Sequence, residues 1–474
     1  MAKPARTEHD LLGDRDVPAH VYWGIHTARA LENFPITGQP IGSYPDLIRA
    51  LMLVKQSAAL ANRELGGIDD MRANVIVAAC REIADGALHD QFVVDVIQGG
   101  AGTSTNMNAN EVIANLALER LGRSKGDYAY LHPIEHVNKS QSTNDVYPTA
   151  VRVAVCFAIE RLLAAMRELR AAFEAKSNEF RDVLKLGRTQ LQDAVPMTLG
   201  QEFSTYAVML GEDELRLREA ADLMHEINLG ATAIGTGINT DPRYAGLACR
   251  HLVELSGIAL VSAPNLIEAT QDAGGFVQLS GVLKRIAVKL SKTCNDLRLL
   301  SSGPQAGLAE INLPPRAAGS SIMPGKVNPI IPEVVNQVAF EVIGNDVTVT
   351  MAAEGGQLQL NAFEPIIVHS LFKSLQHLRE ACFTLTRNCV GGITANRERL
   401  ERIVRNSAAL ATALNPLIGY EKASRVAQEA LKTGRPVAEL VLEMGYLTQA
   451  ELDALLRPEI LTQPFSIHQL ARSK

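Results

Sequence analysis

The sequence is poor in aromatic residues and has no cysteine pattern. Aromatic side chains make up 5% of the 474 residues, with a single tryptophan, Trp23, so aliphatic side chains must supply most of the buried surface. The six cysteines form no CxxC pair and no paired spacing, which argues against a disulfide framework and a zinc knuckle. We therefore expect buried free thiols in a protein stabilised mainly by aliphatic packing.

A large excess of charge and long apolar runs are also missing. The 46 basic and 52 acidic side chains leave a formal charge of −6, which gives no general electrostatic reason to bind nucleic acid or an anionic membrane. No stretch approaches about eighteen uninterrupted apolar residues, and the first ten residues lack the apolar segment of a secretion signal. The sequence predicts a soluble cytoplasmic protein with a small-molecule substrate, no nucleic acid partner and no membrane partner.

Common catalytic and nucleotide-binding motifs are absent as well. The eleven histidines form no HExxH or HxH pattern, and no serine lies in a nucleophile-elbow context. Gly319 and Gly325 enclose one residue too many for a P-loop, and Val327 stands where the P-loop has a hydroxyl residue. We predict no metal-ligating residues.

Four long segments repeat apolar residues at alternating steps of three and four, which is typical of helices that pack along a seam. These segments are 151–173, 197–227, 276–297 and the stretch from Pro329 or Pro332 to Met351. Strand signals are sparse throughout. The sequence thus predicts a mainly all-α fold with a bundle of long helices, whose seams often also pack between subunits.

Polar loops near residues 145 and 395 divide the chain into three expected domains. These are a mostly helical N-terminal domain (1–145), a central long-helix bundle that carries the 319–329 loop (146–395) and a small helical C-terminal domain (396–474). In the last domain, Gly434 and Pro436 interrupt a helix, and Thr448 with Glu451 forms a capping box.

Four polar segments that contain glycine or precede a helix interrupt the aliphatic background, at 99–108, 136–145, 187–193 and 319–329. Their hydroxyl and amide side chains can hold an anion, but alternatives remain for each one alone. Segment 99–108 could serve only to cap a helix, and loop 319–329 could be ordinary polar surface. We expect His136 to be a structural histidine, and Asp145 could be a helix cap.

Taken together, the four segments favour one dianionic, non-phosphorylated substrate held by neutral donors and one lysine. In the last segment, Ser320 is a possible base, Lys326 a cation and Asn328 an additional donor. Thr189 and Gln190 suit an amine or hydroxyl leaving group.

Loop 319–329 reads GSSIMPGKVNP and fits the signature GSSxMPxKxNP, so the chain resembles the aspartase/fumarase superfamily of lyases. Four further motifs occur in the expected order, and the resemblance covers nearly the whole chain from about Leu11. These motifs are VYWGIHT (21–27), GGAGTSTNMNANE (99–111), KSQSTND (139–145) and GRTQLQDAVP (187–196).

Within the superfamily, the chain resembles the aspartases more than the fumarases. Gln190 stands where fumarases usually carry histidine, although some aspartases also carry histidine there. The segments EGGQLQLN (354–361), GATAIGTGINT (230–240) and INLPPRAAGSS (311–321) also favour the aspartases.

The resemblance implies a three-domain fold, a homotetramer with a helical core, and active sites that each combine segments from three subunits. It implies elimination of ammonia from L-aspartate to give fumarate through an aci-carboxylate intermediate, with Ser320 as the base. Three groups of side chains are implied to bind the substrate. They are Thr103, Ser142, Thr143 and Ser321 for the β-carboxylate, Asn144, Thr189 and Gln190 for the amino group, and Lys326 and Asn328 for the α-carboxylate.

The resemblance also implies that no cofactor is required, whereas a divalent cation such as Mg²⁺ can activate relatives. Two alternatives stay open at this point. One is a fumarase-type conversion of fumarate and malate, and the other is a structural relative without catalytic activity.

Overall fold

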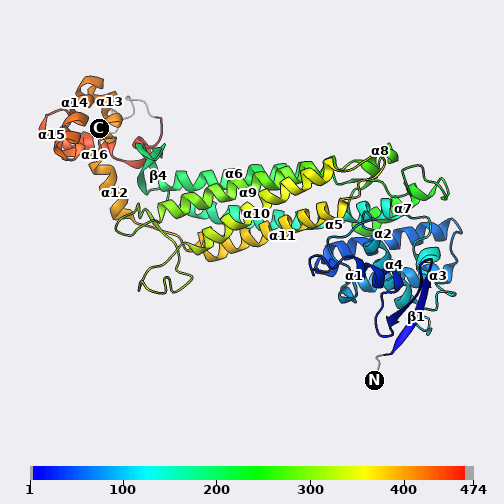
Figure 1. Cartoon of the computed structure of the whole chain (residues 1–474). Coiled ribbons are helices and arrows are strands. Elements are labelled where there is room, and N and C mark those ends of the chain that lie inside the picture. The colour runs from blue at the N-terminus through cyan, green and yellow to red at the C-terminus, as the bar shows by residue number, and fades with distance from the viewer. Residues whose placement is uncertain (1–3, 465–474) are drawn as a thin grey trace. The chain divides into compact units, whose positions relative to one another are not determined.

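The computed structural model describes residues 4–464 and consists mostly of helices (Figure 1). Within this range, strands occur only in four two-stranded sheets. This confirms the prediction of a mainly all-α fold. The long helices are α2 (Pro45–Glu64), α5 (Thr143–Glu179), α6 (Leu199–Asp222), α9 (Gly274–Leu300), α10 (Ile330–Glu354) and α11 (Glu364–Asn388).

All four helices predicted from apolar periodicity are present, as α5, α6, α9 and α10. Helix α6 is shorter than predicted at both ends, because Met197 and Thr198 belong to strand β4 (Gln192–Thr198), and the helix ends at Asp222, before strand β5 (Glu226–Ile227). Helix α11 was not predicted, although buried residues recur along it at steps of three and four. Those residues are Ile367, Leu371, Leu375, Leu378, Cys382 and Leu385.

The chain forms two compact units. Unit 1 contains the described residues up to Leu163 together with Leu215–Ala287 and Phe340–Arg379. Unit 2 contains Ala164–Glu214, Val288–Ala339 and the described residues from Glu380 onward. The division into three domains remains a prediction.

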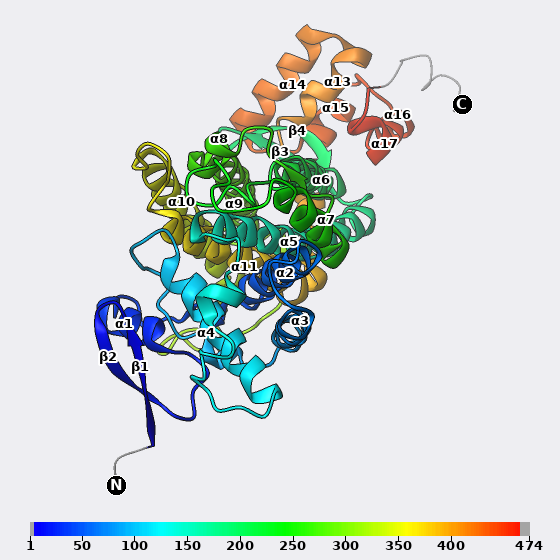
Figure 2. The same ribbon diagram turned by 90° about the vertical axis from the view of Figure 1, so that its right-hand side faces the viewer.

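In unit 1, helix α2 packs against α3 (Asp70–Ala84), α4 (Thr103–Arg120) and α7 (Tyr244–Ser256). Figure 2 shows the antiparallel hairpin of β1 (Ala5–Asp10) and β2 (Gly13–Pro18) beside α1 (Ile25–Asn33). Helix α4 is buried from Thr105 to Leu118 even though this stretch contains four asparagines. A helix that buries so many amides needs hydrogen-bonding partners on several sides.

Unit 1 also contains several short elements. They are η1 (Ile41–Ser43), η2 (His89–Gln91), the π-helical turn η3 (Pro133–Val137), β5 (Glu226–Ile227), β6 (Val261–Ser262) and α8 (Leu266–Gln271).

In unit 2, strand β3 (Leu184–Thr189) pairs with β4 in an antiparallel hairpin, and β7 (Ile311–Asn312) pairs with β8 (Thr394–Ala395). The C-terminal helices gather around an apolar cluster that includes Leu410, Val426 and Leu440. The elements of this part are η4 (Val390–Gly392), α12 (Arg397–Asn406), α13 (Leu410–Ile418), α14 (Tyr420–Thr433), α15 (Val437–Glu443), α16 (Gln449–Leu455) and α17 (Pro458–Leu461).

Several local predictions are confirmed. Gly434 ends α14 with a left-handed backbone, and Pro436 caps α15. Thr448 and Glu451 form the predicted capping box. All six cysteines are free and buried. Between residues 4 and 464, no helix is both long enough and apolar enough to cross a lipid bilayer.

Candidate functional site

The first polar segment is a tight backbone turn that leads into α4. Gly100, Ala101 and Gly102 all have positive φ, at 87°, 53° and 89°. A Cβ atom on Gly102 would lie 2.5 Å from the Tyr147 ring, so only glycine fits there. Thr103 begins the helix, and its exposed hydroxyl donates to the Gly100 carbonyl at 2.7 Å. Thr103, the predicted donor to the β-carboxylate, therefore lies at the N-terminus of α4, which is the positive end of the helix dipole.

The second segment starts α5 with a reciprocal cap. Ser142 Oγ accepts from the Asn144 amide at 3.2 Å, and Asp145 Oδ1 accepts from the Ser142 amide at 2.9 Å. Ser142 is thus the cap residue and Asp145 lies in the first turn, which corrects the suggestion that Asp145 itself is the cap. Asp145 Oδ2 also accepts from the Gly230 and Thr232 amides at 3.0 and 3.1 Å.

A buried lysine holds this segment from behind. Lys55 lies in the middle of α2 with no exposed surface, and its Nζ donates to Asn138 Oδ1 at 2.8 Å and to Gln141 Oε1 at 2.9 Å. Burial lowers the pKa of Lys55 to about 7, although the negative charge of Asp145 opposes this shift. A neutral amine has two N–H donors, which match the two amide oxygens.

Amides from α4 complete the network. The Asn106 and Asn110 side chains each donate to Asn138 Oδ1 at 3.2 Å. Asn106 also donates to Thr143 Oγ1 at 3.1 Å. Because the Thr143 oxygen acts as an acceptor here, its own hydrogen is left to donate to a substrate.

Asn144 is held in a similar way. Its side-chain Nδ2 donates to the Ala233 carbonyl at 2.8 Å, and its backbone carbonyl accepts from Asn228. These contacts fix the orientation of the side-chain amide and leave Asn144 Oδ1 as an acceptor. An ammonium or amine group of a substrate could donate a hydrogen bond to it.

Asp145 and His136 have structural surroundings. Burial raises the pKa of Asp145 to about 6, although three backbone amides and Lys55 oppose the shift. His136 Nδ1 accepts from the His132 amide at 2.8 Å within the turn that contains η3. This contact fits the prediction of a structural histidine.

In unit 2, Thr189 and Gln190 lie at the tip of the β3–β4 hairpin. Gln190 and Leu191 form the two-residue turn and have positive φ, at 54° and 63°. Two positive φ values are typical of a type I′ turn, although asparagine and glycine are preferred there. The tip residues are exposed.

The base of the hairpin is anchored by buried charge. Lys185 and Glu310 are each 1% exposed and form an ion pair at 2.6 Å. Arg188 also pairs with Glu310, and Lys185 pairs with Glu202. These contacts fix the strand that leads to Thr189 and the start of the stretch that leads to the signature loop.

The signature loop, residues 319–329, leaves the helices between α9 and α10 as an open excursion (Figure 1). Gly319 has φ 86°, and a Cβ atom there would overlap the Lys326 carbonyl, so this glycine allows the two ends of the loop to meet. Ser320 Oγ accepts from the Ile322 and Met323 amides, both at 3.3 Å. Lys326 is exposed, and its ammonium has no hydrogen-bonding or ionic partner in residues 4–464.

The structure therefore connects some of the predicted residues. Hydrogen bonds join segment 99–108 to segment 136–145, so Thr103, Ser142, Thr143 and Asn144 belong to one connected part of unit 1. The remaining predicted residues lie on two segments of unit 2, the hairpin and the signature loop, and no hydrogen bond among the described residues joins the two tips. Those residues are Thr189, Gln190, Ser320, Ser321, Lys326 and Asn328.

Sequence reasoning missed Lys55, and it included Asn106 and Asn138 in the polar segments without predicting that they support other side chains. A signal existed for Lys55, because it is the only charged residue in the mostly apolar stretch from Ala50 to Leu60. The asparagines gave a weaker signal, since amides at a helix start also occur as caps. No group of three or more metal-ligating side chains forms within the described part of the chain.

Comparisons with known proteins identify the family. A family model described as Lyase matches residues 13–344, and one described as Fumarase C C-terminus matches residues 410–463. The chain belongs to the aspartase/fumarase superfamily of lyases. This confirms the resemblance predicted from the sequence.

Two curated relatives in the family match almost the entire chain. The aspartate ammonia-lyase of Pseudomonas fluorescens is 60% identical over 460 residues, which cover 97% of this chain and 96% of the relative. The aspartate ammonia-lyase of Escherichia coli is 55% identical over 465 residues, covering 98% and 97%.

Solved structures of the family have the same fold. Fumarate lyase:delta crystallin from Brucella melitensis bound to cobalt is 55% identical, with a TM-score of 0.95 over 97% of this chain and 100% of that one. A class II fumarase from Schistosoma mansoni is 34% identical, with a TM-score of 0.91 over 98% of this chain and 100% of that one.

Proposed function

We propose that this lyase catalyses the reversible elimination of ammonia from L-aspartate to give fumarate. The observation that carries the proposal is the 55–60% identity, over nearly the full chain, to relatives named aspartate ammonia-lyase. The fumarase alternative is supported by the 34% identical class II fumarase. The lower identity favours ammonia over water as the leaving group.

Ser320 is the proposed base, which removes a proton from Cβ. A serine hydroxyl is a weak base in water, so the site must stabilise its alkoxide. The Ile322 and Met323 amides, which donate to Ser320 Oγ, would do so, and they would become stronger donors to a charged oxygen. Lys326, on the same loop, would add positive charge once the loop closes over substrate.

Removal of the Cβ proton leaves negative charge on the β-carboxylate, which becomes an aci-carboxylate. Thr103, Ser142, Thr143 and Ser321 are the proposed donors to this group. Thr143 is the best prepared, because Asn106 holds its oxygen and leaves its hydrogen free. Preorganised donors of this kind typically contribute about 3 to 4 kcal/mol each to stabilising a developing oxyanion.

Breakage of the Cα–N bond then releases ammonia and forms the double bond of fumarate. Asn144, Thr189 and Gln190 would contact the amino group. Lys326 and Asn328 would hold the α-carboxylate through a cation and an amide. The hydrogen bond from Asn144 Nδ2 to the Ala233 carbonyl supports the role proposed for Asn144, because it leaves Oδ1 as the atom that can accept from the amino group.

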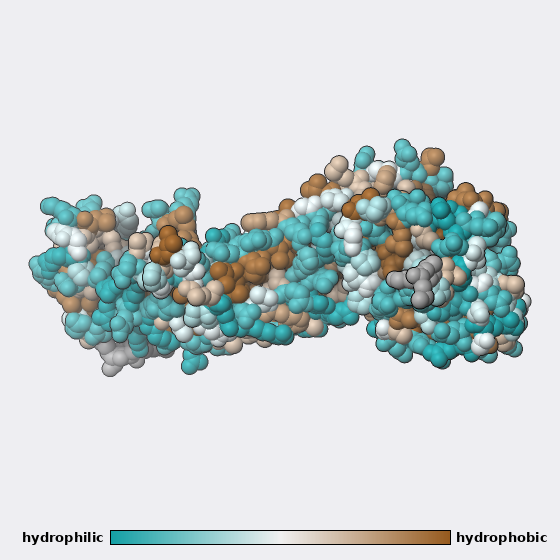
Figure 3. All heavy atoms as spheres, turned by 60° about the horizontal axis from the view of Figure 1, so that its bottom comes forward, coloured by the Kyte–Doolittle hydropathy of each residue, from teal (hydrophilic) through white to brown (hydrophobic). Residues whose placement is uncertain are grey.

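We propose that the chain acts as a homotetramer in which three subunits contribute to each site. Large apolar side chains on α10 support an association surface: Val334, Phe340, Val347 and Met351 are 43%, 62%, 56% and 68% exposed. Figure 3 shows apolar side chains gathered over helices on the face in view. Exposed apolar surface of this kind commonly marks a protein contact.

The proposed reaction needs no redox cofactor, because it moves a proton and a leaving group and transfers no electrons between molecules. Activation by a divalent cation such as Mg²⁺ remains a prediction from the family resemblance, and a cytoplasmic location remains a prediction from the composition of the sequence.

The deciding experiment follows fumarate formation by its ultraviolet absorbance, with L-aspartate and L-malate supplied side by side. Faster turnover of L-aspartate is expected. Faster turnover of L-malate would replace the proposal with the fumarase alternative, and no turnover of either substrate would support a structural relative.

A further inference from the structure

The tip of the β3–β4 hairpin has a backbone conformation that its residues do not favour. Gln190 and Leu191 form the turn with positive φ, at 54° and 63°, although neither is glycine or asparagine. Leu191 is 71% exposed, so packing of its side chain does not explain the conformation. Backbone strain of this kind persists only where the surrounding structure enforces it. Contacts outside the turn must therefore fix the tip.

The pairing of the two strands shows what has to be fixed. The pairing register shifts by one residue between Leu186 and Arg188. Without this shift, Thr189 would lie opposite Asp193 instead of Gln192, and the turn would contain three residues, which is also a common length in hairpins. A one-residue slip changes the face of a hairpin on which a side chain lies. The direction in which Thr189 points therefore depends on the register.

Arg188 holds the strand on the tip side of this shift. Its guanidinium forms an ion pair with Glu310, whose carboxylate also pairs with Lys185 at 2.6 Å. The backbone of Glu310 is fixed as well, because its amide donates to the Leu300 carbonyl at 2.8 Å and its carbonyl accepts from the Asn396 amide at 2.9 Å. Lys185 precedes the shift and Arg188 follows it, so one anchored carboxylate spans the irregular part of the strand.

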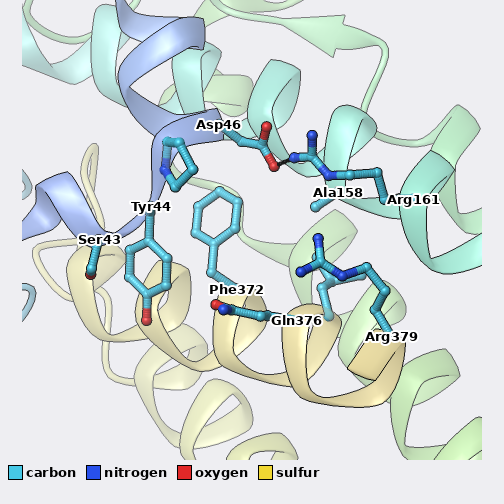
Figure 4. Close-up of a pocket in the computed structure, with 10 residues that line it drawn as sticks. Ser43, Tyr44, Asp46, Ala158, Arg161, Phe372, Gln376 and Arg379 are labelled. Carbon is cyan, nitrogen blue, oxygen red and sulfur yellow. Dashed lines mark ion pairs between the residues drawn. The ribbon is translucent and has the colours of Figure 1, made fainter. Parts of the chain in front are cut away.

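A second pair of carboxylate and arginine, in unit 1, lies in more open surroundings. Asp46 pairs with Arg161 beside a cavity of about 210 Å³, and Figure 4 shows that Arg379 also faces this cavity. The Arg161 side chain is 43% exposed, whereas those of Glu310 and Lys185 are each 1% exposed. Taking charges out of water costs free energy that their pairing barely repays, so a buried pair adds little net stability. Selecting one of several arrangements is the best-attested role of such a pair.

We propose that Glu310 is a positioning residue, which holds the hairpin tip in the shifted register through Arg188 and so directs Thr189 and Gln190 toward the amino group of the substrate. This inference rests on the proposed function, because the amino group is that of L-aspartate. The proposed contacts to the two carboxylates come from other segments. Loss of the Glu310 carboxylate should therefore weaken recognition of the amino group and leave recognition of the carboxylates intact.

Steady-state assays on the full chain separate these two kinds of contact. Succinate has the two carboxylates of L-aspartate and lacks its amino group, so it is the probe for carboxylate binding alone. Glu310→Gln should lower kcat/KM for L-aspartate roughly 10- to 100-fold, as a misplaced substrate contact does. The inhibition constant of succinate, measured against L-aspartate, should change by less than about twofold, because the carboxylate contacts are retained.

Glu202→Gln is the matched control. Glu202 pairs with Lys185 at 2.5 Å in the same network, but among residues 4–464 it forms no ion pair or hydrogen bond with Arg188. This variant should leave both kinetic quantities close to wild type, and thermal unfolding of each variant measures any damage to the fold.

Arg188→Gln tests the same contact from its other side. It should reproduce the loss seen in Glu310→Gln, and it carries the test if Glu310→Gln does not fold, because the Arg188 side chain is partly exposed (16%). The double variant should be no worse than either single variant, since both changes break one contact.

Four results would overturn the inference. They are a wild-type kcat/KM in Glu310→Gln, an equal loss in Glu202→Gln, a succinate constant that rises in step with the loss for L-aspartate, and effects of Glu310→Gln and Arg188→Gln that multiply in the double variant. The proposed function fails on a different observation, namely a wild type that prefers L-malate. The same variants assayed with L-malate would then test whether Glu310 positions contacts to its hydroxyl group. A wild type inactive on both substrates would overturn both proposals.

Discussion

Two regions of this lyase carry the same kinds of side chain in opposite surroundings. In unit 1, Thr143 and its neighbours are held by a buried network that includes Lys55 and Asn106. In unit 2, Ser320 and Lys326 lie on a loop, and within the described residues the Ser320 hydroxyl is hydrogen bonded only to amides of that same loop. The first region is fixed before substrate arrives, whereas the second has few contacts that fix it.

This difference separates two tasks of the proposed reaction. Donors to an oxyanion act best when they are already in place, because they then need no reorganisation as charge develops. A base on a loop can close after substrate binds and exclude water from the site. We therefore expect substitutions in the first region to affect chemistry and folding together, and substitutions in the loop to affect chemistry or binding alone.

The largest effect is expected for Ser320→Ala. Loss of the base should lower the turnover of L-aspartate by about 10² to 10⁴ or more. The midpoint of thermal unfolding should stay unchanged because, among residues 4–464, the Ser320 hydroxyl is hydrogen bonded only within its own loop. Stopped assays of fumarate and thermal unfolding measure the two quantities. Ser301→Ala, which lies just after the last residue of α9, is the control. If Ser320→Ala turns over L-aspartate at nearly the wild-type rate, Ser320 is not the base.

Thr143→Val should lower turnover by about 10² to 10³, since it removes one donor to the developing oxyanion. Unlike Ser320→Ala, it should also destabilise the fold by about 1 kcal/mol, because the buried Asn106 amide loses one of its two acceptors and keeps only Asn138. Thr350→Val is the matched control, since its hydroxyl bonds only to the helix carbonyl of Asp346. Full activity with reduced stability would show that Thr143 is only structural.

Lys326→Met should raise the KM for L-aspartate by roughly 10- to 100-fold, as expected for one lost hydrogen bond to a charged group. The fold should be unaffected because the ammonium is exposed. Lys432→Met, on the exposed surface of α14, controls for loss of a positive charge. An unchanged KM would contradict the assignment of Lys326 to the α-carboxylate.

The last prediction concerns stability and not catalysis, and its effect on the free energy of unfolding is small over any single pH unit. The pKa of Lys55 is about 7 in the folded chain and near 10.5 when exposed. Between these values the unfolded chain binds one proton more at this residue, so its contribution to the free energy of unfolding rises with pH, by at most about 1.4 kcal/mol per pH unit.

Lys55→Met lacks this contribution. The stability of the wild type minus that of the variant should therefore increase between about pH 7 and pH 10, as measured by urea unfolding at a fixed protein concentration. The Lys432→Met control should follow the wild type at every pH. A difference that stays constant or shrinks as the pH rises would contradict a buried neutral lysine.

Much of this molecule was predictable because its signals are local. The periodicity of apolar residues predicted α5, α6, α9 and α10, and the residues around Thr448 predicted a cap that the structure confirms. The same method missed α11 and misplaced both ends of α6. It failed at α6 because pairing with β3, a contact with another segment, decides where the helix begins.

The sequence by itself determined the helical fold class, the family and the side chains available for chemistry, since all three depend on residue types and short spacings. Only the tertiary structure decided that Lys55 lies buried behind Asn138 and Gln141, that Ser142 rather than Asp145 caps α5, and that Arg161 and Arg379 face one cavity. Burial and long-range hydrogen bonds set these properties, and they arise only when segments far apart in the chain pack together.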